Sequence, residues 1–315
     1  MTATQDAALI AVDWGTTNLR AMLLAADGAT LAEAGSDDGI GSVAAGGHEA
    51  AFERLVAGWP KVPALMAGMI GSRQGWREVP YVTCPATPAA IAAGILRFET
   101  TAGRPVAIVP GVMVRSADRD GDVIRGEETQ MVGLLGRDGG YDGLAILPGT
   151  HSKWATIQDG AIADFQTFLT GELFHLFTSH SFLRHSVTAG DGDLSTFEDF
   201  ALGVRRTVEE GLPFLAAIFS VRARQLLDGT DQHANRAYLS GLVIGGEIAA
   251  ARAAGRLPER GAVGIVGARS LARAYRKAFE VAGIATETLD GSEMVLAGLT
   301  RLAREIDFLP QGTQP

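Results

Sequence analysis

The chain has 315 residues, of which 47% are hydrophobic and 20% charged, a globular composition long enough for two domains with separate cores. Its net charge of −9 argues against a nucleic acid or an anionic membrane as the main partner. The single cysteine, Cys84, excludes an intrachain disulfide and a thiolate metal cluster.

The first segment has the pattern of a β-meander. Apolar runs at 8–12 and 19–25 enclose a Gly-Thr-Thr turn, and an Asp-Gly turn precedes a third strand at 29–34. A similar pattern recurs at 144–168, where the two Gly-Thr turns begin at Gly15 and Gly149, 134 positions apart. We interpret the repeat as two homologous domains, each opening with a meander. A chance likeness of two hairpins is the alternative.

The rest of the chain alternates strands with helices. Buried strands are predicted at 64–71, 106–110 and 262–266, and another at 238–243 that leads through a glycine pair into a helix at 247–254. Helices are predicted at 127–135, 172–183, 197–227, 270–282 and 292–304. This alternation predicts an α/β fold.

The turn after the first strand is a candidate phosphate site. Asp13 ends a buried strand, and Gly15, Thr16 and Thr17 follow it. Backbone N–H groups and hydroxyls in such a turn can bind phosphate oxygens, and the carboxylate can hold Mg²⁺ through water. Plain hairpin turns use the same residues, so one such turn is a weak signal. The presence of two such turns is what favours a phosphate site.

The second turn supplies a matching set of donors. Thr150 and Ser152 offer hydroxyls beside Gly149 and His151, and Lys153 can neutralise phosphate charge. A solvated strand lysine is the alternative for Lys153. The two turns are expected to bind one polyphosphate across an interdomain cleft.

Two acidic residues open the helix predicted at 127–135. Glu127 or Glu128 can accept the proton of an attacking hydroxyl, as phosphoryl transfer to an alcohol requires. Alternatively, both only favour the helix dipole. The sequence lacks the Gly-x-x-x-x-Gly-Lys-Ser/Thr and early Gly-x-Gly-x-x-Gly nucleotide signatures.

These turns resemble the two phosphate motifs of the hexokinase, actin and Hsp70 superfamily. The segments 67–72, 123–130, 149–154 and 170–174 resemble more specifically the 2-dehydro-3-deoxygalactonokinases, over nearly the whole chain. The resemblance implies two duplicated actin-like ATPase (ribonuclease H-like) domains. It also implies ATP and Mg²⁺ as cofactors and phosphorylation of 2-dehydro-3-deoxygalactonate at its C6 hydroxyl, in galactonate catabolism.

The resemblance also assigns residues. Many sugar kinases of the superfamily have an aspartate base where this chain has Glu127 and Glu128, which leaves the identity of the base open. Asp13 is the expected metal residue. Binding of the sugar acid is assigned by position to Asn18, Arg20, Ser72, Arg73 and Arg125, and binding of adenosine to Gly241, Gly245 and Gly246.

The resemblance divides the chain into an N-terminal domain at 1–136, a C-terminal domain at 137–290 and a returning helix and tail at 291–315. A kinase for another sugar or sugar acid, or a non-catalytic sugar sensor, are the alternatives. The sequence shows no signal peptide pattern and no long apolar run, so a cytoplasmic protein is expected, with room for a homodimer.

Overall fold

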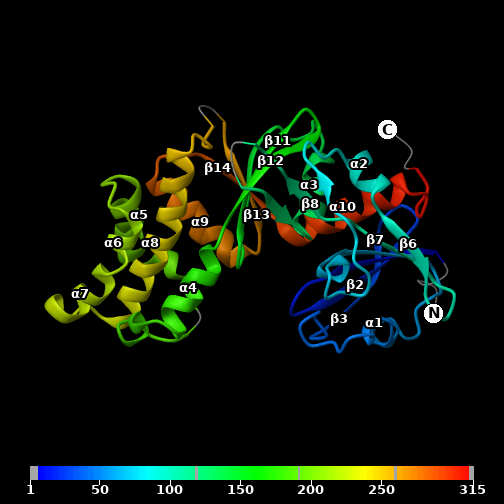
Figure 1. Cartoon of the computed structure of the whole chain (residues 1–315), viewed down its shortest axis with the longest axis horizontal. Coiled ribbons are helices and arrows are strands. Elements are labelled where there is room, and N and C mark those ends of the chain that lie inside the picture. Colours follow the sequence, from blue (N-terminus) through cyan, green and yellow to red (C-terminus); the bar gives the residue numbers. More distant parts are fainter. Residues whose placement is uncertain (1–5, 118–119, 191, 259–260, 312–315) are drawn as a thin grey trace. The chain divides into compact units, whose positions relative to one another are not determined.

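A computed structural model describes residues 6–117, 120–190, 192–258 and 261–311. The chain forms two compact units. Unit 1 comprises Met1–Asp142, Ile157–Asp164 and Ser292–Pro315, and unit 2 comprises Gly143–Thr156 and Phe165–Gly291. Figure 1 labels many of the elements of the two units.

Unit 1 is built on a six-stranded sheet with the order β3-β2-β1-β4-β7-β6. The first three strands are antiparallel, β1, β4 and β7 are parallel, and β6 is antiparallel to β7. The strands are β1 (Ala7–Trp14), β2 (Leu19–Ala25), β3 (Thr30–Ser36), β4 (Ala64–Gly68), β6 (Leu96–Glu99) and β7 (Pro105–Ile108).

The two faces of β1 have different surroundings. Ile10, Val12 and Trp14 are fully buried in the cluster that packs on α1 (His48–Leu55). Because side chains alternate along a strand, Asp13 emerges on the other face. On that side α3 (Glu127–Leu135) and α10 (Gly291–Glu305) pack backbone to backbone, since a Cβ on Gly298 would lie 1.9 Å from a carbonyl oxygen of α3.

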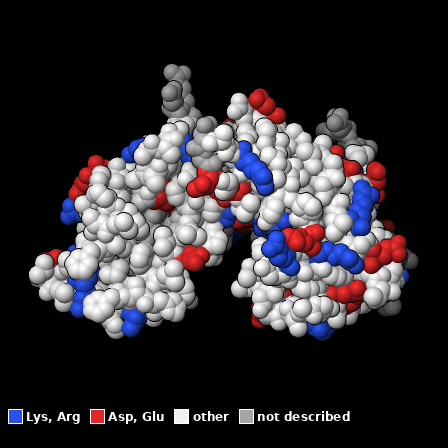
Figure 2. Space-filling view, in the orientation of Figure 1, with Lys and Arg blue, Asp and Glu red and all other residues white. Residues whose placement is uncertain are grey.

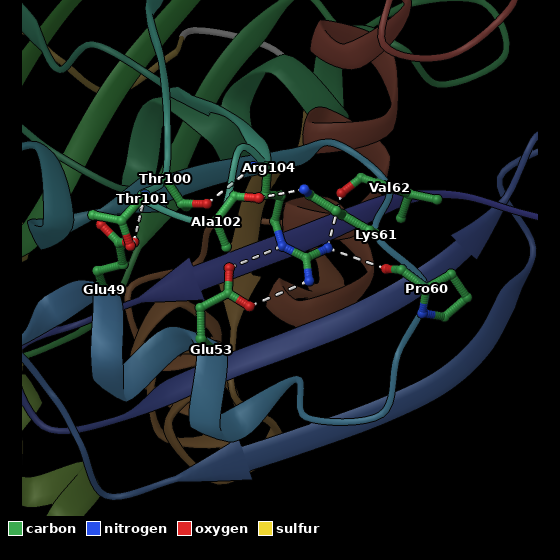
Figure 3. Close-up of polar contacts among 9 residues, drawn as sticks. All are labelled: Glu49, Glu53, Pro60, Lys61, Val62, Thr100, Thr101, Ala102 and Arg104. Atoms are coloured by element: carbon green, nitrogen blue, oxygen red, sulfur yellow. Dashed lines mark hydrogen bonds and ion pairs between the residues drawn. The ribbon is translucent and has the colours of Figure 1, made fainter.

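A buried arginine ties α1 to the turn between β6 and β7 (Figure 3). The Arg104 side chain is 6% exposed and pairs with Glu53 at 3.0 Å. The same guanidinium donates to the carbonyl oxygens of Pro60 and Val62 and lies 5.7 Å from the centre of the Phe52 ring. Four N–H groups of the guanidinium therefore hold this edge of unit 1 together.

A smaller sheet and several short helices complete unit 1. The sheet has the order β5-β8-β9, in which β8 is parallel to β5 and antiparallel to β9. The elements are β5 (Val82–Thr83), β8 (Val112–Val114), β9 (Asp122–Ile124), α2 (Pro88–Ala93) and the 3₁₀ turn η1 (Met69–Gly71).

Unit 2 repeats the strand order of unit 1. Its five-stranded sheet has the order β12-β11-β10-β13-β14. Two strands follow its meander on the far side of the first meander strand, where unit 1 has three. The strands are β10 (Gly143–Leu147), β11 (Ser152–Gln158), β12 (Ala161–Phe168), β13 (Val263–Gly267) and β14 (Thr286–Asp290). The prediction of two duplicated α/β domains is thus confirmed.

The helices of unit 2 include one long buried helix that the sequence analysis missed. The strand predicted at 238–243 is wrong, because these residues lie inside α8 (Gln232–Ala253). α8 packs closely on α5 (Glu198–Val208), where a Cβ on Gly241 would lie 2.1 Å from the carbonyl oxygen of Phe200. The remaining helices are α4 (Thr170–Ser179), η2 (Phe182–His185), η3 (Leu194–Thr196), α6 (Phe214–Ala217), α7 (Ser220–Asp228) and α9 (Arg269–Val281).

The surface is mixed in charge. In the face shown in Figure 2, basic and acidic side chains are interspersed among uncharged ones in both units. Within the residues that the structure describes, no helix has the length and apolar character needed to cross a membrane.

Candidate active site

The β1–β2 turn presents exposed polar groups beside a half-buried carboxylate. The N–H of Gly15 donates to the carbonyl oxygen of Asn18 at 2.9 Å, which closes the turn. Thr16, Thr17 and Asn18 are exposed within it. Asp13 pairs in register with Arg20 across β1 and β2. The turn therefore offers hydroxyls and a carboxylate to a ligand, with a cation adjacent.

The segment 39–41, which follows β3, holds this turn through backbone hydrogen bonds. The N–H groups of Ile40 and Gly41 donate to the carbonyl oxygens of Gly15 and Thr16 at 3.1 and 3.0 Å. A Cβ on Gly39 would lie 2.3 Å from the Thr16 carbonyl oxygen, so only glycine fits there. The sequence analysis did not include this support, although four glycines within 39–47 were a visible signal of a tight loop.

The beginning of α3 lies near Asp13. The N-cap Gly126 has a φ of +111°, a conformation that side chains other than glycine rarely adopt. Its N–H donates at 2.7 Å to the carboxylate of Glu128, which is fully buried. Glu127 is half-buried and accepts the backbone N–H of Arg125 at 3.2 Å. Of the two candidate bases, only Glu127 is open to solvent.

The three carboxylates are electrostatically coupled. Burial raises the pKa of Asp13, the Arg20 charge lowers it and the Glu127 charge raises it. Burial and the charge of Glu127 raise the pKa of Glu128 to about 7, against hydrogen bonds from backbone N–H groups and the charge of Arg125. The structure therefore brings Asp13, Arg20 and Glu127 into one charged cluster.

Beside this cluster lies a second group with unsatisfied donors. The guanidinium of Arg125 donates to the Val79 carbonyl oxygen at 2.7 Å and lies 4.5 Å from the centre of the Tyr81 ring. Its Nε and Nη1 atoms are buried and have no hydrogen-bond partner among the described residues, and the same holds for Oγ of Ser72, a side chain 7% exposed. A Cβ on Gly71 would lie 2.7 Å from Nη1 of Arg125, so the two buried donor groups lie close together.

The other two candidate arginines have different surroundings. The Arg73 side chain is 82% exposed and faces Glu78 at 3.6 Å. Arg20 is also exposed and its charge acts on Asp13. Buried, unpaired polar groups are costly unless a ligand satisfies them. Arg125 is therefore the arginine best suited to bind an anionic ligand.

The second turn has one exposed side and one buried side. Thr150 and His151 are exposed, and Nε2 of His151 lies 2.5 Å from a carboxylate oxygen of Glu172. Ser152 is fully buried, and Lys153 is 4% exposed with its Nζ donating to the His151 carbonyl oxygen at 2.6 Å. The alternative of a solvated lysine at 153 is therefore wrong.

A cavity of about 570 Å³ opens beside this turn within unit 2. Gly149 at its wall marks the end nearest the turn, and the remaining wall contains apolar side chains from four elements together with polar and charged ones such as Asp193, Arg236 and Arg273. The apolar side chains are Phe174, Leu194, Val243, Ile244, Leu271 and Ala274. Such a chamber suits a flat apolar group attached to a phosphate chain.

The three glycines assigned to adenosine do not line this cavity. Gly241 and Gly245 face α5, and a Cβ on Gly245 would lie 2.3 Å from Oγ1 of Thr207. Gly246 packs against the ring of Phe214, since a Cβ on Gly246 would lie 2.8 Å from that ring. Their visible role is close helix packing, whereas their neighbours on α8 face the cavity.

A metal ion at this site would depend on few protein ligands. Among the described residues, no group of three or more His, Cys, Asp or Glu side chains forms a metal cage. Mg²⁺ at phosphate sites commonly uses one or two carboxylates together with phosphate oxygens and water. The half-buried carboxylate of Asp13 beside the exposed Gly-Thr-Thr turn fits that pattern.

Comparisons with known proteins show the family of the chain. A family model described as 2-keto-3-deoxy-galactonokinase matches residues 13–302. The chain is 39% identical over 299 residues to the protein named probable 2-dehydro-3-deoxygalactonokinase DgoK1 of Rhizobium meliloti (strain 1021), covering 94% of this chain and 96% of that protein. It is 33% identical to the 2-dehydro-3-deoxygalactonokinase of Escherichia coli (strain K12), covering 94% and 98%.

A solved structure has the same fold. The crystal structure of a protein assigned as 2-dehydro-3-deoxygalactonokinase from Sinorhizobium meliloti superimposes with a TM-score of 0.89 at 38% identity. The match covers 95% of this chain and 99% of that one, so it extends over both units.

Proposed function

Because the chain belongs to the 2-keto-3-deoxy-galactonokinase family, we propose that the first turn and the start of α3, both in unit 1, form the catalytic centre of a sugar-acid kinase with the actin-like ATPase fold. The enzyme phosphorylates 2-dehydro-3-deoxygalactonate. With ATP as donor and the C6 hydroxyl as acceptor, the products are 2-dehydro-3-deoxy-6-phosphogalactonate and ADP. The observation that carries the residue assignment is the coupled cluster of Asp13, Arg20 and Glu127 at the first turn.

Glu127 is proposed as the general base. The C6 hydroxyl gives its proton to the Glu127 carboxylate, the freed oxygen forms a bond to the γ-phosphorus, and the bond to ADP breaks. Glu127 is half-buried, so it can reach a substrate, whereas Glu128 is enclosed and already accepts the N–H of Gly126. Glu128 is instead proposed to fix the first turn of α3.

Arg125 and Ser72 are proposed to bind the carboxylate of the sugar acid. The two buried nitrogens of Arg125 and the buried hydroxyl of Ser72 supply donors that no described residue uses. A guanidinium held by stacking on Tyr81 is preorganised to bind a carboxylate. Exposed Arg73 is less suited, and Arg20 and Asn18 are proposed to contact the sugar nearer the first turn.

Each turn is proposed to offer donors suited to nucleotide phosphates. Gly15, Thr16 and Thr17 offer N–H groups and hydroxyls to phosphate oxygens, and Gly149 and Thr150 do the same in the second turn. The adenosine is proposed to occupy the 570 Å³ cavity of unit 2. Asp13 would hold Mg²⁺, which supplies charge neutralisation to the transferring phosphoryl group.

An ADP-release assay tests this proposal. Release is expected with Mg-ATP and 2-dehydro-3-deoxygalactonate together, and to fall by at least about a hundredfold in Asp13→Asn, as phosphoryl transfer relies on metal and preorganised donors. Circular dichroism should show that the variant is folded. A panel of other 2-keto-3-deoxy sugar acids and plain hexoses tests substrate choice. Equal ADP release with and without any acid would contradict the proposal.

A further inference from the structure

A single buried carboxylate joins four elements of unit 2. Glu247 of α8 is 4% exposed. One of its oxygens accepts the indole N–H of Trp154 on β11 at 2.5 Å. The other accepts the hydroxyls of Thr170 at the start of α4 and of Tyr275 on α9, at 2.5 and 2.6 Å. Trp154, Thr170 and Tyr275 lie 93, 77 and 28 positions from Glu247 in the chain.

The network reaches the second turn through Tyr275. Its hydroxyl lies 2.5 Å from Oγ of Ser152, the last residue of the turn, which is fully buried. Because the Tyr275 hydroxyl donates to Glu247, it accepts from Ser152. Ser152 therefore anchors the turn to the core, and the exposed part of the turn consists of Thr150 and His151, next to half-buried Gly149.

The start of α4 is attached to the same turn from another side. The N–H of Glu172 donates to the carbonyl oxygen of Thr150 at 2.9 Å. A Cβ on Gly171 would lie 2.5 Å from the carbonyl oxygen of Gly149, so α4 touches the turn directly. Thr170 links this helix start to Glu247. The carboxylate thus fixes the turn and the wall that adjoins it relative to each other.

A carboxylate removed from water is stable only when donors replace its hydration. Three donors converge on Glu247, which is enough to compensate much of that cost. Such a network is satisfied in one arrangement of its members and becomes costly when any one of them moves. It therefore restricts the turn to a single position.

We propose that Glu247 and Tyr275 are positioning residues that hold the second turn in the geometry that binds the phosphates of ATP. The inference rests on the nucleotide site proposed above. Tyr275 and Thr170 line the cavity, whereas Glu247 and Ser152 do not, so Ser152→Ala tests the link without altering the cavity wall. Glu247 and Ser152 are therefore expected to affect binding only through the turn.

Tyrosine-to-phenylalanine substitutions provide the test. Tyr275→Phe removes the hydroxyl that links Ser152 to Glu247 and keeps the buried ring. Tyr238→Phe is the matched control, since Tyr238 is also a buried tyrosine of unit 2 whose hydroxyl lies 2.8 Å from a serine, Ser220, and it does not line the cavity. Ser152→Ala breaks the same link from the side of the turn.

Binding of the non-hydrolysable ATP analogue AMP-PNP with Mg²⁺ is measured by calorimetry, and both KM values by ADP release. Tyr275→Phe and Ser152→Ala should each weaken AMP-PNP binding about tenfold, the effect of losing one buried hydrogen bond. The double variant should be no weaker than the worse single one, because both remove the same link. The KM for the sugar acid should stay unchanged, and Tyr238→Phe should bind AMP-PNP like the wild type.

Equal weakening in Tyr275→Phe and Tyr238→Phe would overturn the inference, as would unchanged binding in both Tyr275→Phe and Ser152→Ala. Additive losses in the double variant would also overturn it, since they indicate separate direct contacts. Absence of AMP-PNP binding to the wild type would overturn the nucleotide site itself, and with it this inference.

Discussion

Glu128 makes a specific prediction about how stability depends on pH. Its carboxyl is fully buried, and its pKa is raised from an ordinary 4.5 to about 7. Between these two values the folded chain retains a proton that the unfolded chain has lost. The free energy of unfolding therefore decreases as pH rises through this window, and the whole penalty is present above pH 7. Glu128→Gln keeps the shape and removes the titration.

The size of the effect follows from the shift. A pKa difference of about 2.5 corresponds to about 3 kcal/mol, most of which develops between pH 5 and pH 8. The glutamine carbonyl can still accept the N–H of Gly126, and its amide can donate to Thr129. Relative to the wild type, Glu128→Gln should therefore gain about 2–3 kcal/mol of stability between pH 5 and pH 8.

Urea unfolding followed by tryptophan fluorescence at pH 5, 6, 7 and 8 measures this gain. Three of the four tryptophans, Trp14, Trp59 and Trp76, lie in unit 1 with Glu128, so the signal reports mainly on the relevant unit. The difference between the two free energies of unfolding should change monotonically with pH. A difference that stays constant within 0.5 kcal/mol, roughly the error of such measurements, would refute the assignment of a raised pKa.

Three further substitutions test the site and the fold. Glu127→Gln should lower kcat by roughly 10²–10⁴-fold in the ADP-release assay, because it removes the proposed base; a kcat near that of the wild type would place the base elsewhere. Arg125→Lys should raise the KM for the sugar acid by about 10–100-fold, because charged hydrogen bonds are lost. As a control, Arg73→Lys at the exposed arginine should leave this KM within about twofold of the wild type. Equal effects of the two substitutions would contradict the choice of Arg125. Arg104→Met should lower the free energy of unfolding by roughly 3–5 kcal/mol, because it leaves Glu53 unpaired. The kcat at low temperature should stay unchanged. Chemical denaturation measures the loss, and a change below about 1 kcal/mol would show that the pair is dispensable.

The duplicated meander could be predicted because its signals are local. Apolar runs of strand length, Asp-Gly turns and Gly-Thr turns each act within a few residues, and the structure has a strand at every predicted place in both repeats. Asp159 and Gly160 adopt positive φ angles of 52° and 73°, as a tight hairpin turn of this kind requires. The helix at 127–135 was equally clear from its apolar pattern.

The prediction at 238–243 was wrong for a physical reason. α8 is buried on most of its surface, so its apolar residues do not repeat at the helical period and resemble a buried strand. Its glycines, which suggested a strand-to-helix turn, instead allow α5 to approach closely. A short apolar run with glycines is ambiguous until its packing partner is known.

Contacts between residues far apart in the chain could not be predicted from the sequence. Nothing near Glu247 in the sequence indicates that an indole and two hydroxyls converge on its carboxylate, because these partners come from three other elements. Likewise, Arg20, Arg73 and Arg125 could not be ranked by position alone. Burial distinguishes them, since only the guanidinium of Arg125 has enclosed donors without a partner among the described residues.

The two copies of the meander have diverged at the position that decides their chemistry. Asp13 stands two residues before Gly15, but the residue two before Gly149 is Leu147, which is buried in the core of unit 2. At the same offset, the counterpart of Arg20 is Trp154, also buried. A carboxylate at 147 would need a charged partner or hydration that this core does not offer. Both turns remain proposed as phosphate donors, whereas the Asp13 carboxylate and the Arg20 charge beside it have no counterpart at the equivalent positions of the second turn.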